Sequence, residues 1–519
     1  MKNSMTDTIK RASDFPVIMI GEGLFIGALA GLVVLLYRIS LSYAGIWMNQ
    51  ILGWIQGNPI RILLWFLALA AMAVVTGLLV KWEPMISGSG IPQLEGEMTG
   101  KLEQRWYRII PEKFIGGFLG MFAGLALGRE GPSIQLGAMV GKGVSRVLKR
   151  GKTEEKFLLT CGASAGLAAA FHAPLAGVMF AMEEVHKNFS GAVFISAMTA
   201  SVAADYITSS VLGMEPVFQF QIVGNLPVQY YWMLVVLGVI VGLMGVFYNW
   251  FTLMAQTLYK KSGLKSPVAK ALVPFLLAGV VGLVVPEILG SGHSMIETLT
   301  DGKMALAAVI LLFVLRFLFS GISFGSGVPG GIFFPMLVLG AYIGGIFGYI
   351  CADYLGLPAD YINNFVLLAM AGYFTAVVRA PLTGIILIFE LTGSLSQMLS
   401  LSVITIVAYI TAMLMKSEPI YESLLGRILE GKQIPQESEE GEKVLDYYAV
   451  AEESEIADRM IKEIQWPEHC LIVAIQRGDK EIIPKGKTRL FMGDVIITMT
   501  DEAHNGEVYD AMSQLCRKR

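Results

Sequence analysis

Long apolar runs follow one another through most of the chain, and they constrain the fold more than any other feature. The runs lie near 17–40, 60–80, 114–128, 157–182, 192–212, 230–256, 268–290, 305–322, 329–352, 362–378, 381–393 and 398–415. A helix that crosses a membrane needs about 20 apolar residues, and several of these runs reach that length. Only 16% of the residues are charged, against about 25% in soluble globular proteins. We therefore expect an all-α polytopic membrane protein.

One apolar stretch, 114–140, is interrupted by charged residues. Its motif GREGP (128–132) places Arg129 and Glu130 between glycines. Basic segments flank the stretch on both sides, and basic loops prefer the cytoplasm, so the chain is expected to enter and leave on one face. Each half has about 15 residues, which is too short to span a membrane alone. The pattern predicts two half-helices that meet at the break, where irregular backbone is tolerated if it is buried in protein or lines a polar cavity.

An internal repeat relates two halves of the membrane region. LGAMVG at 136–141 recurs as LGAYIG at 339–344, an offset of 339 − 136 = 203. HAPLAGVMFAMEE at 172–184 recurs as RAPLTGIILIFEL at 379–391, an offset of 379 − 172 = 207. Inverted repeats with broken helices are typical of transporters, whose substrate site lies near the membrane midplane where the repeats meet.

Three glycine-rich breaks carry the candidate chemistry: GSGIP (88–92), GREGP and GSGVPGGIFFP (325–335). Each opens into an apolar helical run, and a helix N-terminus offers unpaired N–H groups and a partial positive charge. Several such termini at membrane depth would hold an anion, and Ser89 adds a hydroxyl donor. The first offset places Glu130 opposite Phe333. Tight helix packing at glycines is the alternative, and three similar breaks in one repeated architecture disfavour it.

The character of the chain changes from about residue 431. A polar linker, 431–443, separates a membrane region, 1–430, from a small soluble α+β domain, 444–519. In that domain VLDYYAV reads as a strand, SEIADRMIKEIQ (454–465) as an amphipathic helix, and three further segments as short strands. The basic loops place this domain in the cytoplasm.

The motifs GSGIP, GREGP and GGIFFP together resemble the CLC family of chloride channels and chloride/proton antiporters, over approximately residues 15–430. The resemblance implies the CLC fold, with two inverted repeats of short broken helices, and a homodimer in which each subunit has its own pore. It also implies a set of chloride-binding residues: Ser89, Gly90, Ile332, Phe333 and Tyr421. For Tyr421 the alternative is an ordinary aromatic residue at the membrane interface.

The same resemblance gives Glu130 a role. Ionisable residues inside a membrane are costly and usually functional. In the family this glutamate is the external gate, and its protonation exchanges a proton against chloride. The alternative is a structural salt bridge with Arg129, which does not explain why the pair lies in a helix break.

A second carboxylate separates an antiporter from a channel. By resemblance, Glu184 in FAMEEVHKN is the internal proton glutamate, which channels of the family generally lack. The repeat aligns Glu183 with Glu390 but Glu184 with Leu391. The repeated glutamate is therefore interpreted as structural and the unrepeated one as specialised, with a solvated helix end as the plain alternative. We expect a chloride/proton antiporter; the alternative is a passive proton-gated chloride channel.

The C-terminal domain resembles the C-terminal lobe of potassium-conductance regulators, the RCK or TrkA-C domain, in CLIVAIQRGDKEIIPKGKTRLFMGDVIIT. This implies a prokaryotic plasma-membrane protein. Such lobes dimerise and bind small ligands, cyclic di-AMP in some cases, and a purely dimerising role is equally open. By the resemblance to the CLC family, Ser89 in GSGIP implies a preference for chloride, which does not exclude bromide or nitrate.

Other functional classes find little support. The cytosolic part carries no catalytic dyad, metal cluster or nucleotide loop, so we do not expect an enzyme. His172 and His186 lack ligand spacing, and we expect no metal, cofactor or nucleic-acid partner; chloride, protons and the lipid bilayer are the expected partners. The cysteines show neither metal nor disulfide spacing: Cys161, Cys351, Cys470 and Cys516.

Overall fold

The computed structural model describes the backbone of residues 2–187, 191–218, 222–302, 304–430, 443–451, 454–477, 480–501 and 505–516. The chain forms two compact units, Met1–Ile428 and Leu429–Arg519, which are described separately. The linker predicted at 431–443 lies outside the described residues except for Lys443.

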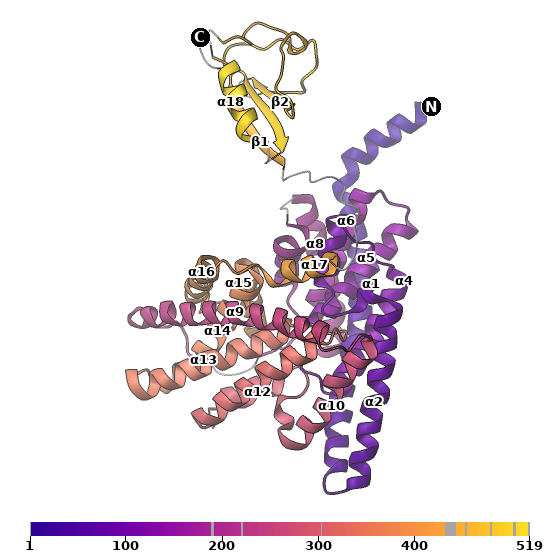
Figure 1. Ribbon diagram of the computed structural model, residues 1–519, viewed down its shortest axis with the longest axis vertical. Helices are drawn as coiled ribbons and strands as arrows, with labels where there is room; N and C mark the ends of the chain where they lie inside the picture. Colours follow the sequence, from indigo (N-terminus) through magenta and orange to yellow (C-terminus); the bar gives the residue numbers. More distant parts are fainter. Residues whose placement is uncertain are drawn as a thin grey trace. The chain divides into compact units, whose positions relative to one another are not determined.

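The regular elements of the first unit are all helices, and they differ greatly in length (Figure 1). Pro59 and Pro267 begin their helices at the first turn, where a missing N–H costs nothing, and Asn58 and Ser266 cap them. The α-helices are α1 (Lys2–Ile55), α2 (Pro59–Trp82), α3 (Ile91–Met98), α4 (Trp106–Phe122), α5 (Glu130–Val147), α6 (Lys152–Phe171), α7 (Pro174–Phe180), α8 (Gly191–Leu212), α9 (Tyr231–Lys261), α10 (Pro267–Val284), α11 (His293–Thr300), α12 (Leu306–Gly325), α13 (Phe333–Leu355), α14 (Ile362–Val378), α15 (Pro381–Thr392), α16 (Met398–Leu414) and α17 (Ile420–Glu430). Short helical turns are η1 (Pro84–Ile86), η2 (Ala181–His186), η3 (Val228–Tyr230), η4 (Pro286–Ile288) and η5 (Ala359–Tyr361).

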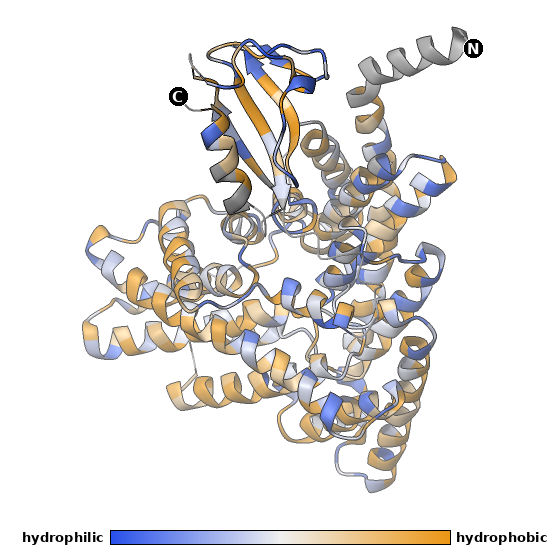
Figure 2. Cartoon of the chain, turned by 45° about the horizontal axis from the view of Figure 1, so that its top comes forward, coloured by the Kyte–Doolittle hydropathy of each residue, from blue (hydrophilic) through white to orange (hydrophobic). Residues whose placement is uncertain are grey.

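Seven helical stretches among the described residues are long and apolar enough to cross a membrane. They are Val17–Ile55, Pro59–Trp82, Val228–Lys261, Pro267–Val284, Leu306–Gly325, Phe333–Leu355 and Ala359–Val378. Hydrophobic residues dominate the helices of this unit (Figure 2). Many large apolar side chains face outward, including Trp82 and Tyr206. Such exposure is unfavourable in water and is expected of a surface that lies against lipid.

The predicted repeat is visible in how the helices pack. α5 lies against α6 in the first half, and α13 lies against α14 in the second. A methyl group on Gly141 would collide with the carbonyl oxygen of Leu158, and one on Gly344 with that of Phe365. The two glycines are 344 − 141 = 203 residues apart, and their partners 365 − 158 = 207. Small residues therefore allow equivalent close backbone contacts in both halves.

The predicted half-helices are present, but their flanking segments differ from the expectation. α4 ends at Phe122 and α5 begins at Glu130, so the helix is broken around GREGP as predicted. The basic segments, however, are not loops throughout. Lys113 is fully buried within α4, and Lys142 is buried within α5, where it forms an ion pair with Glu97. These two lysines bind buried polar groups inside the protein. They therefore do not indicate on which side of the membrane the chain emerges.

The second unit is a four-stranded antiparallel sheet with one helix. The strands are β1 (Lys443–Ala449), β2 (Leu471–Arg477), β3 (Lys480–Ile482) and β4 (Val495–Asp501), and they lie in the order β1-β4-β2-β3. A short helical turn, η6 (Ile461–Glu463), lies between β1 and β2, and α18 (Asn505–Cys516) follows β4. Alternate strand residues and one face of α18 form its core: Tyr448, Ile475, Ile496, Val508, Met512 and Cys516. This agrees with the predicted small α+β domain.

The helix predicted at 454–465 is wrong. This segment consists of turns and η6, and Asp458 has a left-handed backbone, with φ +64°. Two of its amides bond outside the segment instead of continuing a helix: Asp458 N–H donates to the Leu490 carbonyl and Ile461 N–H to that of Thr488. The apolar side chains that suggested an amphipathic helix therefore pack from an irregular segment. α18, the helix that the unit does contain, was not predicted.

An ion pair between buried Asp494 and partly exposed Arg477 fixes the turn before β4. Asp494, 1% exposed, accepts hydrogen bonds from Arg477 at 2.8 and 2.7 Å and from the Phe491 amide at 2.9 Å. The Arg477 guanidinium also lies 4.5 Å from the centre of the Phe491 ring. Burial alone would raise the pKa of Asp494, but the Arg477 hydrogen bonds and the Phe491 amide hold it below its ordinary value.

Replacing Asp494 by asparagine should therefore destabilise the second unit. The variant keeps the shape but loses the charge-assisted hydrogen bonds, and we expect a loss of about 2 kcal/mol. Amide hydrogen exchange of β4 in the full-length protein measures this loss, with exposed Glu481→Gln as the control. A lowered pKa stabilises the fold above the unfolded pKa, and this contribution disappears as pH falls through the folded pKa. The difference between the two proteins should thus shrink in acid; equal protection at pH 7 would contradict the assignment.

Candidate anion site and its two carboxylates

The two halves of the first unit meet at the start of α5 and α13. Gly128 and Gly331 exchange both backbone hydrogen bonds, each at 2.7 Å, in an antiparallel bridge. The bridge joins equivalent positions, because 331 − 128 = 203. Two residues after the bridge, each of the two segments enters a helix, at Glu130 and at Phe333. Two helix N-termini, with their unpaired N–H groups, therefore converge at one point.

Glu130 lies at this point and is almost fully buried, at 1% exposure. Its Oε1 is 3.6 Å from Arg129 Nε. Its Oε2 has no side-chain partner among the described residues, and the backbone amides of Glu130 and Phe334 lie next to the carboxylate. A Cβ atom on Gly128 would lie 2.5 Å from this oxygen and 3.2 Å from the amide nitrogen of Phe334. The salt bridge considered as an alternative is thus present at one oxygen only, and the other oxygen points toward the start of α13.

The serine of GSGIP packs directly against α5. Ser89 is 2% exposed, and its backbone oxygen would lie 2.9 Å from a Cβ atom on Gly131. Its hydroxyl accepts a hydrogen bond from the Ile91 amide at 3.3 Å, at the start of α3. Gly90 has φ +90° and leaves no room for a side chain, because the Gln135 amide occupies that space. The chain turn therefore requires glycine here.

Two buried cations hold equivalent loops in the two halves, one before α3 and one before α11. Lys113 donates to the carbonyls of Ile86 and Gly88 at 2.8 and 2.7 Å. Arg316 donates to the carbonyls of Ile288 and Gly290 at 2.6 and 2.8 Å. The two cations are equivalent, since 316 − 113 = 203.

Sequence reasoning missed both cations, although Lys113 directly precedes the apolar run 114–128 and Arg316 interrupts the run 305–322. Each is fully buried, and its hydrogen bonds end on backbone carbonyls. Their role is to satisfy carbonyls at a helix break.

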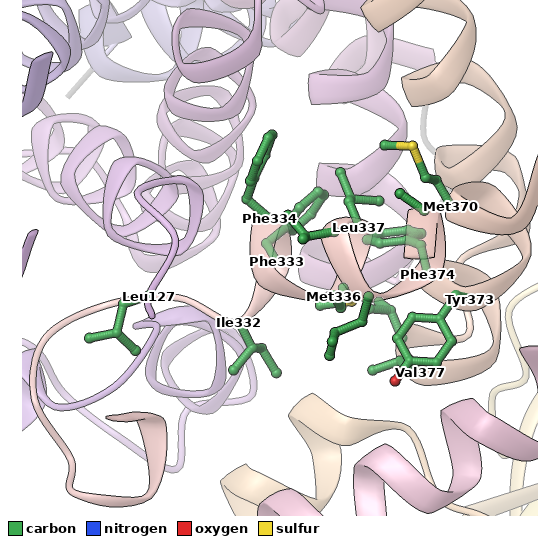
Figure 3. Packing of buried hydrophobic residues seen from close by; sticks show 14 of the residues in the cluster. Leu127, Ile332, Phe333, Phe334, Met336, Leu337, Met370, Tyr373, Phe374 and Val377 are labelled. Carbon is green, nitrogen blue, oxygen red and sulfur yellow. The ribbon is translucent and has the colours of Figure 1, made fainter. Parts of the chain in front are cut away.

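The start of α13 is packed in an aromatic cluster. Ile332, Phe333 and Phe334 follow one another there, with Leu127 on the neighbouring segment (Figure 3). The Phe333 ring centre lies 4.8 Å from that of Phe374.

Phe180 links this cluster to Tyr421. The Phe180 ring centre is 5.8 Å from that of Phe333 and 6.5 Å from that of Tyr421. Tyr421 is fully buried, and its hydroxyl has no hydrogen-bond partner among the described residues. An interfacial aromatic would be exposed, so the burial disfavours that alternative.

Glu183 and Glu390 occupy equivalent positions and perform the same task. Glu183 accepts hydrogen bonds from the amides of Leu382 and Thr383, at 3.2 and 2.7 Å, at the start of α15. Glu390 accepts them from the amides of Leu175 and Ala176, at 2.9 and 2.7 Å, at the start of α7. Each half thus caps a helix of the other. The structure supports the interpretation of the repeated glutamate as structural.

Glu184 shares the turn η2 and a pocket with Glu183, but it does not cap a helix. It lies on η2, a π-helical turn, whereas α15 runs through its counterpart Leu391 as an ordinary α-helix. Its side chain is 5% exposed, and Oε1 has no hydrogen-bond partner among the described residues. It lines a pocket of about 490 Å3 together with Lys187 and Arg379. A solvated helix end would not be so buried, and π-turns are frequent at functional sites.

His172 and His186 bond to side chains of neighbouring helices. His172 contacts Arg38 at 3.0 Å and Asp205 at 3.3 Å. His186 contacts Thr160 at 3.1 Å. Among the residues that the structure describes, no group of three or more His, Cys, Asp or Glu side chains could hold a metal ion.

The arrangement brings Ser89, Glu130, Phe333 and Tyr421 to one region, and Glu184 to a pocket at its edge. It is suited to holding an anion by N–H and O–H donors, and to moving protons through two buried carboxylates.

Comparisons with known proteins agree with this geometry. The family model described as "Voltage gated chloride channel" matches residues 71–413, and the "TrkA-C domain" model matches residues 447–512. The chain is 35% identical to the H(+)/Cl(-) exchange transporter ClcA of Vibrio cholerae over 443 residues, covering 82% of this chain and 93% of the relative. It is 34% identical to the protein of the same name from Citrobacter koseri, covering 78% and 88%.

Solved structures show the same fold. A slow cyanobacterial Cl-/H+ antiporter has a TM-score of 0.75 at 30% identity, over 80% of this chain and 98% of that chain. A CLC-type fluoride/proton antiporter has a TM-score of 0.66 at 20% identity, over 78% and 97%. Since the family model spans more than half of the chain, and the relatives match along most of their length, this protein belongs to the voltage gated chloride channel family.

Proposed function

We propose that the protein is a chloride/proton antiporter, a multi-pass protein of a bacterial membrane. The observation that carries the proposal is the position of Glu130. Its buried carboxylate lies where the N-termini of α5 and α13 converge, next to the Phe334 amide. A carboxylate here takes the place that helix N-termini would offer to a free anion. The relatives named as H(+)/Cl(-) exchange transporters support the same reading.

The exchange follows from this competition. An ionised Glu130 occupies the anion position, and a protonated one leaves it to chloride. The chloride ligands are the hydroxyls of Ser89 and Tyr421 and the backbone amides of Ile332 and Phe333. Gly90 allows the close turn that presents Ser89. All these donors are neutral, so chloride is bound without the strong hold of a full positive charge.

Glu184 supplies the second proton site. It is buried, lacks a partner at Oε1 and lines an open pocket, through which a proton enters from the opposite end of the pathway. A passive proton-gated chloride channel, the alternative function, would need Glu130 but would have no use for Glu184.

Purified wild-type protein in liposomes should move protons uphill when driven by a chloride gradient. Glu130→Ala should still pass chloride, because the anion position is then vacant. Its proton flux should fall by about 100-fold or more, and the pH dependence of chloride flux should largely disappear. Exposed Glu103→Ala is the control. Wild-type chloride flux without proton movement would leave the channel as the function, and intact coupling in Glu130→Ala would refute the gate.

Glu184→Gln keeps the shape of the side chain but cannot carry a proton. Proton flux should fall to background, while chloride movement continues. The matched variant Glu183→Gln weakens the cap of α15 instead, so it should lower stability by about 1 kcal/mol and keep the coupling. Parallel flux and thermal unfolding measurements separate the two residues. Equal loss of both fluxes in Glu184→Gln would make this glutamate structural.

For the second unit we propose a regulatory role, in a homodimer, with cyclic di-AMP as the first candidate ligand. A ligand shifts transport only if it binds one conformation better than another. The full-length protein in liposomes should change its chloride flux when the nucleotide is added on the side of this unit. Binding without any change of flux would leave dimerisation as the role.

A further inference from the structure

Lys187 ends the π-turn that carries Glu184, in a backbone conformation that lysine seldom adopts. Its φ is +52° and its ψ 21°, in the left-handed region. Non-glycine residues in this region are often found at functional sites, where the surrounding structure holds them. The side chain is 38% exposed and forms ion pairs with two carboxylates from other helices, Glu95 of α3 and Glu422 of α17. The distance to Glu422 is 2.5 Å.

Each partner of Lys187 lies close in the chain to a proposed chloride ligand. Glu95 is on the short helix α3, whose N-terminus carries Ser89 and Gly90. Glu422 directly follows Tyr421. One lysine therefore joins the helix that presents the serine, the helix that presents the tyrosine, and the turn that carries the proton glutamate.

The charges around Lys187 are mostly negative. Glu184 faces it from η2, Glu95 from α3 and Glu422 from α17, whereas Glu183 on η2 caps α15. Lys101 is a second cation near Glu95, but it forms no ion pair that the structure shows. Arg379 lines the same pocket and donates to the carbonyls of Tyr409 and Ser417. Lys187 is thus the cation that these carboxylates share.

The second half of the protein lacks this arrangement. The position equivalent to Lys187 is Ser394, since 187 + 207 = 394, and its hydroxyl bonds to Ser396. The position equivalent to Glu184 is Leu391. Lysine and proton glutamate therefore occur together in one half and are both absent from the other.

We propose that Lys187 is a positioning residue that links the charge of Glu184 to the nearby end of the chloride path. The inference rests on the proposed function. While Glu184 is protonated, Lys187 holds Glu95 and Glu422 together, and with them the helices that bear Ser89 and Tyr421. When Glu184 is ionised, a third carboxylate competes for the same ammonium group. The pair with Glu422 yields first, because water screens this 49% exposed carboxylate far more than Glu95, which is 6% exposed.

The test uses the full-length protein in liposomes. Lys187→Met should keep coupled exchange. On the side of the membrane where the pocket of Glu184 opens, it should raise the chloride KM by about threefold to fivefold, as expected for loss of a partly exposed ion pair. The pH profile of proton flux should shift on the same side. Lys187→Arg, which keeps the charge, should restore both values. Lys101→Met is the matched control, because it removes a neighbouring cation that bridges no helices.

Glu422→Gln should reproduce the effect of Lys187→Met, and the double variant should show no more than either single one. Glu422→Gln also carries the test if Lys187→Met does not fold. Equal KM and pH profile in Lys187→Met and Lys101→Met, or additive effects in the double variant, would overturn the proposal. These outcomes are distinct from failure of the proposed function, in which wild-type protein in the same liposomes would show no proton coupling.

Discussion

The reciprocal pair of hydrogen bonds between Gly128 and Gly331 is the contact on which the anion site depends. It brings two helix N-termini together, because the glycines of the bridge have no side chains to keep the two segments apart. Each N-terminus alone carries about half a positive charge. Facing each other, they would repel unless a negative group lay between them, and the carboxylate of Glu130 is that group. In the proposed function, chloride binds by replacing this carboxylate between the two N-termini.

The remainder of the membrane unit maintains this meeting point. Buried Lys113 and Arg316 bond backbone carbonyls that the broken helices leave free. Glycines let the helices behind the N-termini approach until backbones touch. Carbonyls that lack partners are costly in a lipid environment, so these cations contribute to the fold and not to the transport step. The neutral N–H and O–H donors at the site are thus proposed to bind the anion, whereas the buried cations Lys113 and Arg316 hold the backbone of the helix breaks.

Apolar runs, the break at GREGP and the repeat were predictable, because lipid and helix geometry leave periodic patterns in a sequence. The equivalence of Glu183 and Glu390 in the two repeats was predictable for the same reason. A buried lysine and a loop lysine, however, look alike in sequence, so Lys113 and Lys142 were misplaced. The partners of Lys187 lie 92 and 235 residues away, beyond any local pattern. The segment 454–465 has a helical apolar pattern but bonds to another segment, which only tertiary structure reveals.

The exchanged caps also have a consequence for biosynthesis. The first amides of α7 bond to a carboxylate that lies 215 residues further along the chain. When the first half leaves the ribosome and enters the membrane, those amides lack their partner, and lipid offers no substitute. The first half therefore remains incomplete until the second is inserted. Maturation should be a single late docking of two halves, and a chain that is stopped after the first repeat would be left as a substrate for membrane proteases.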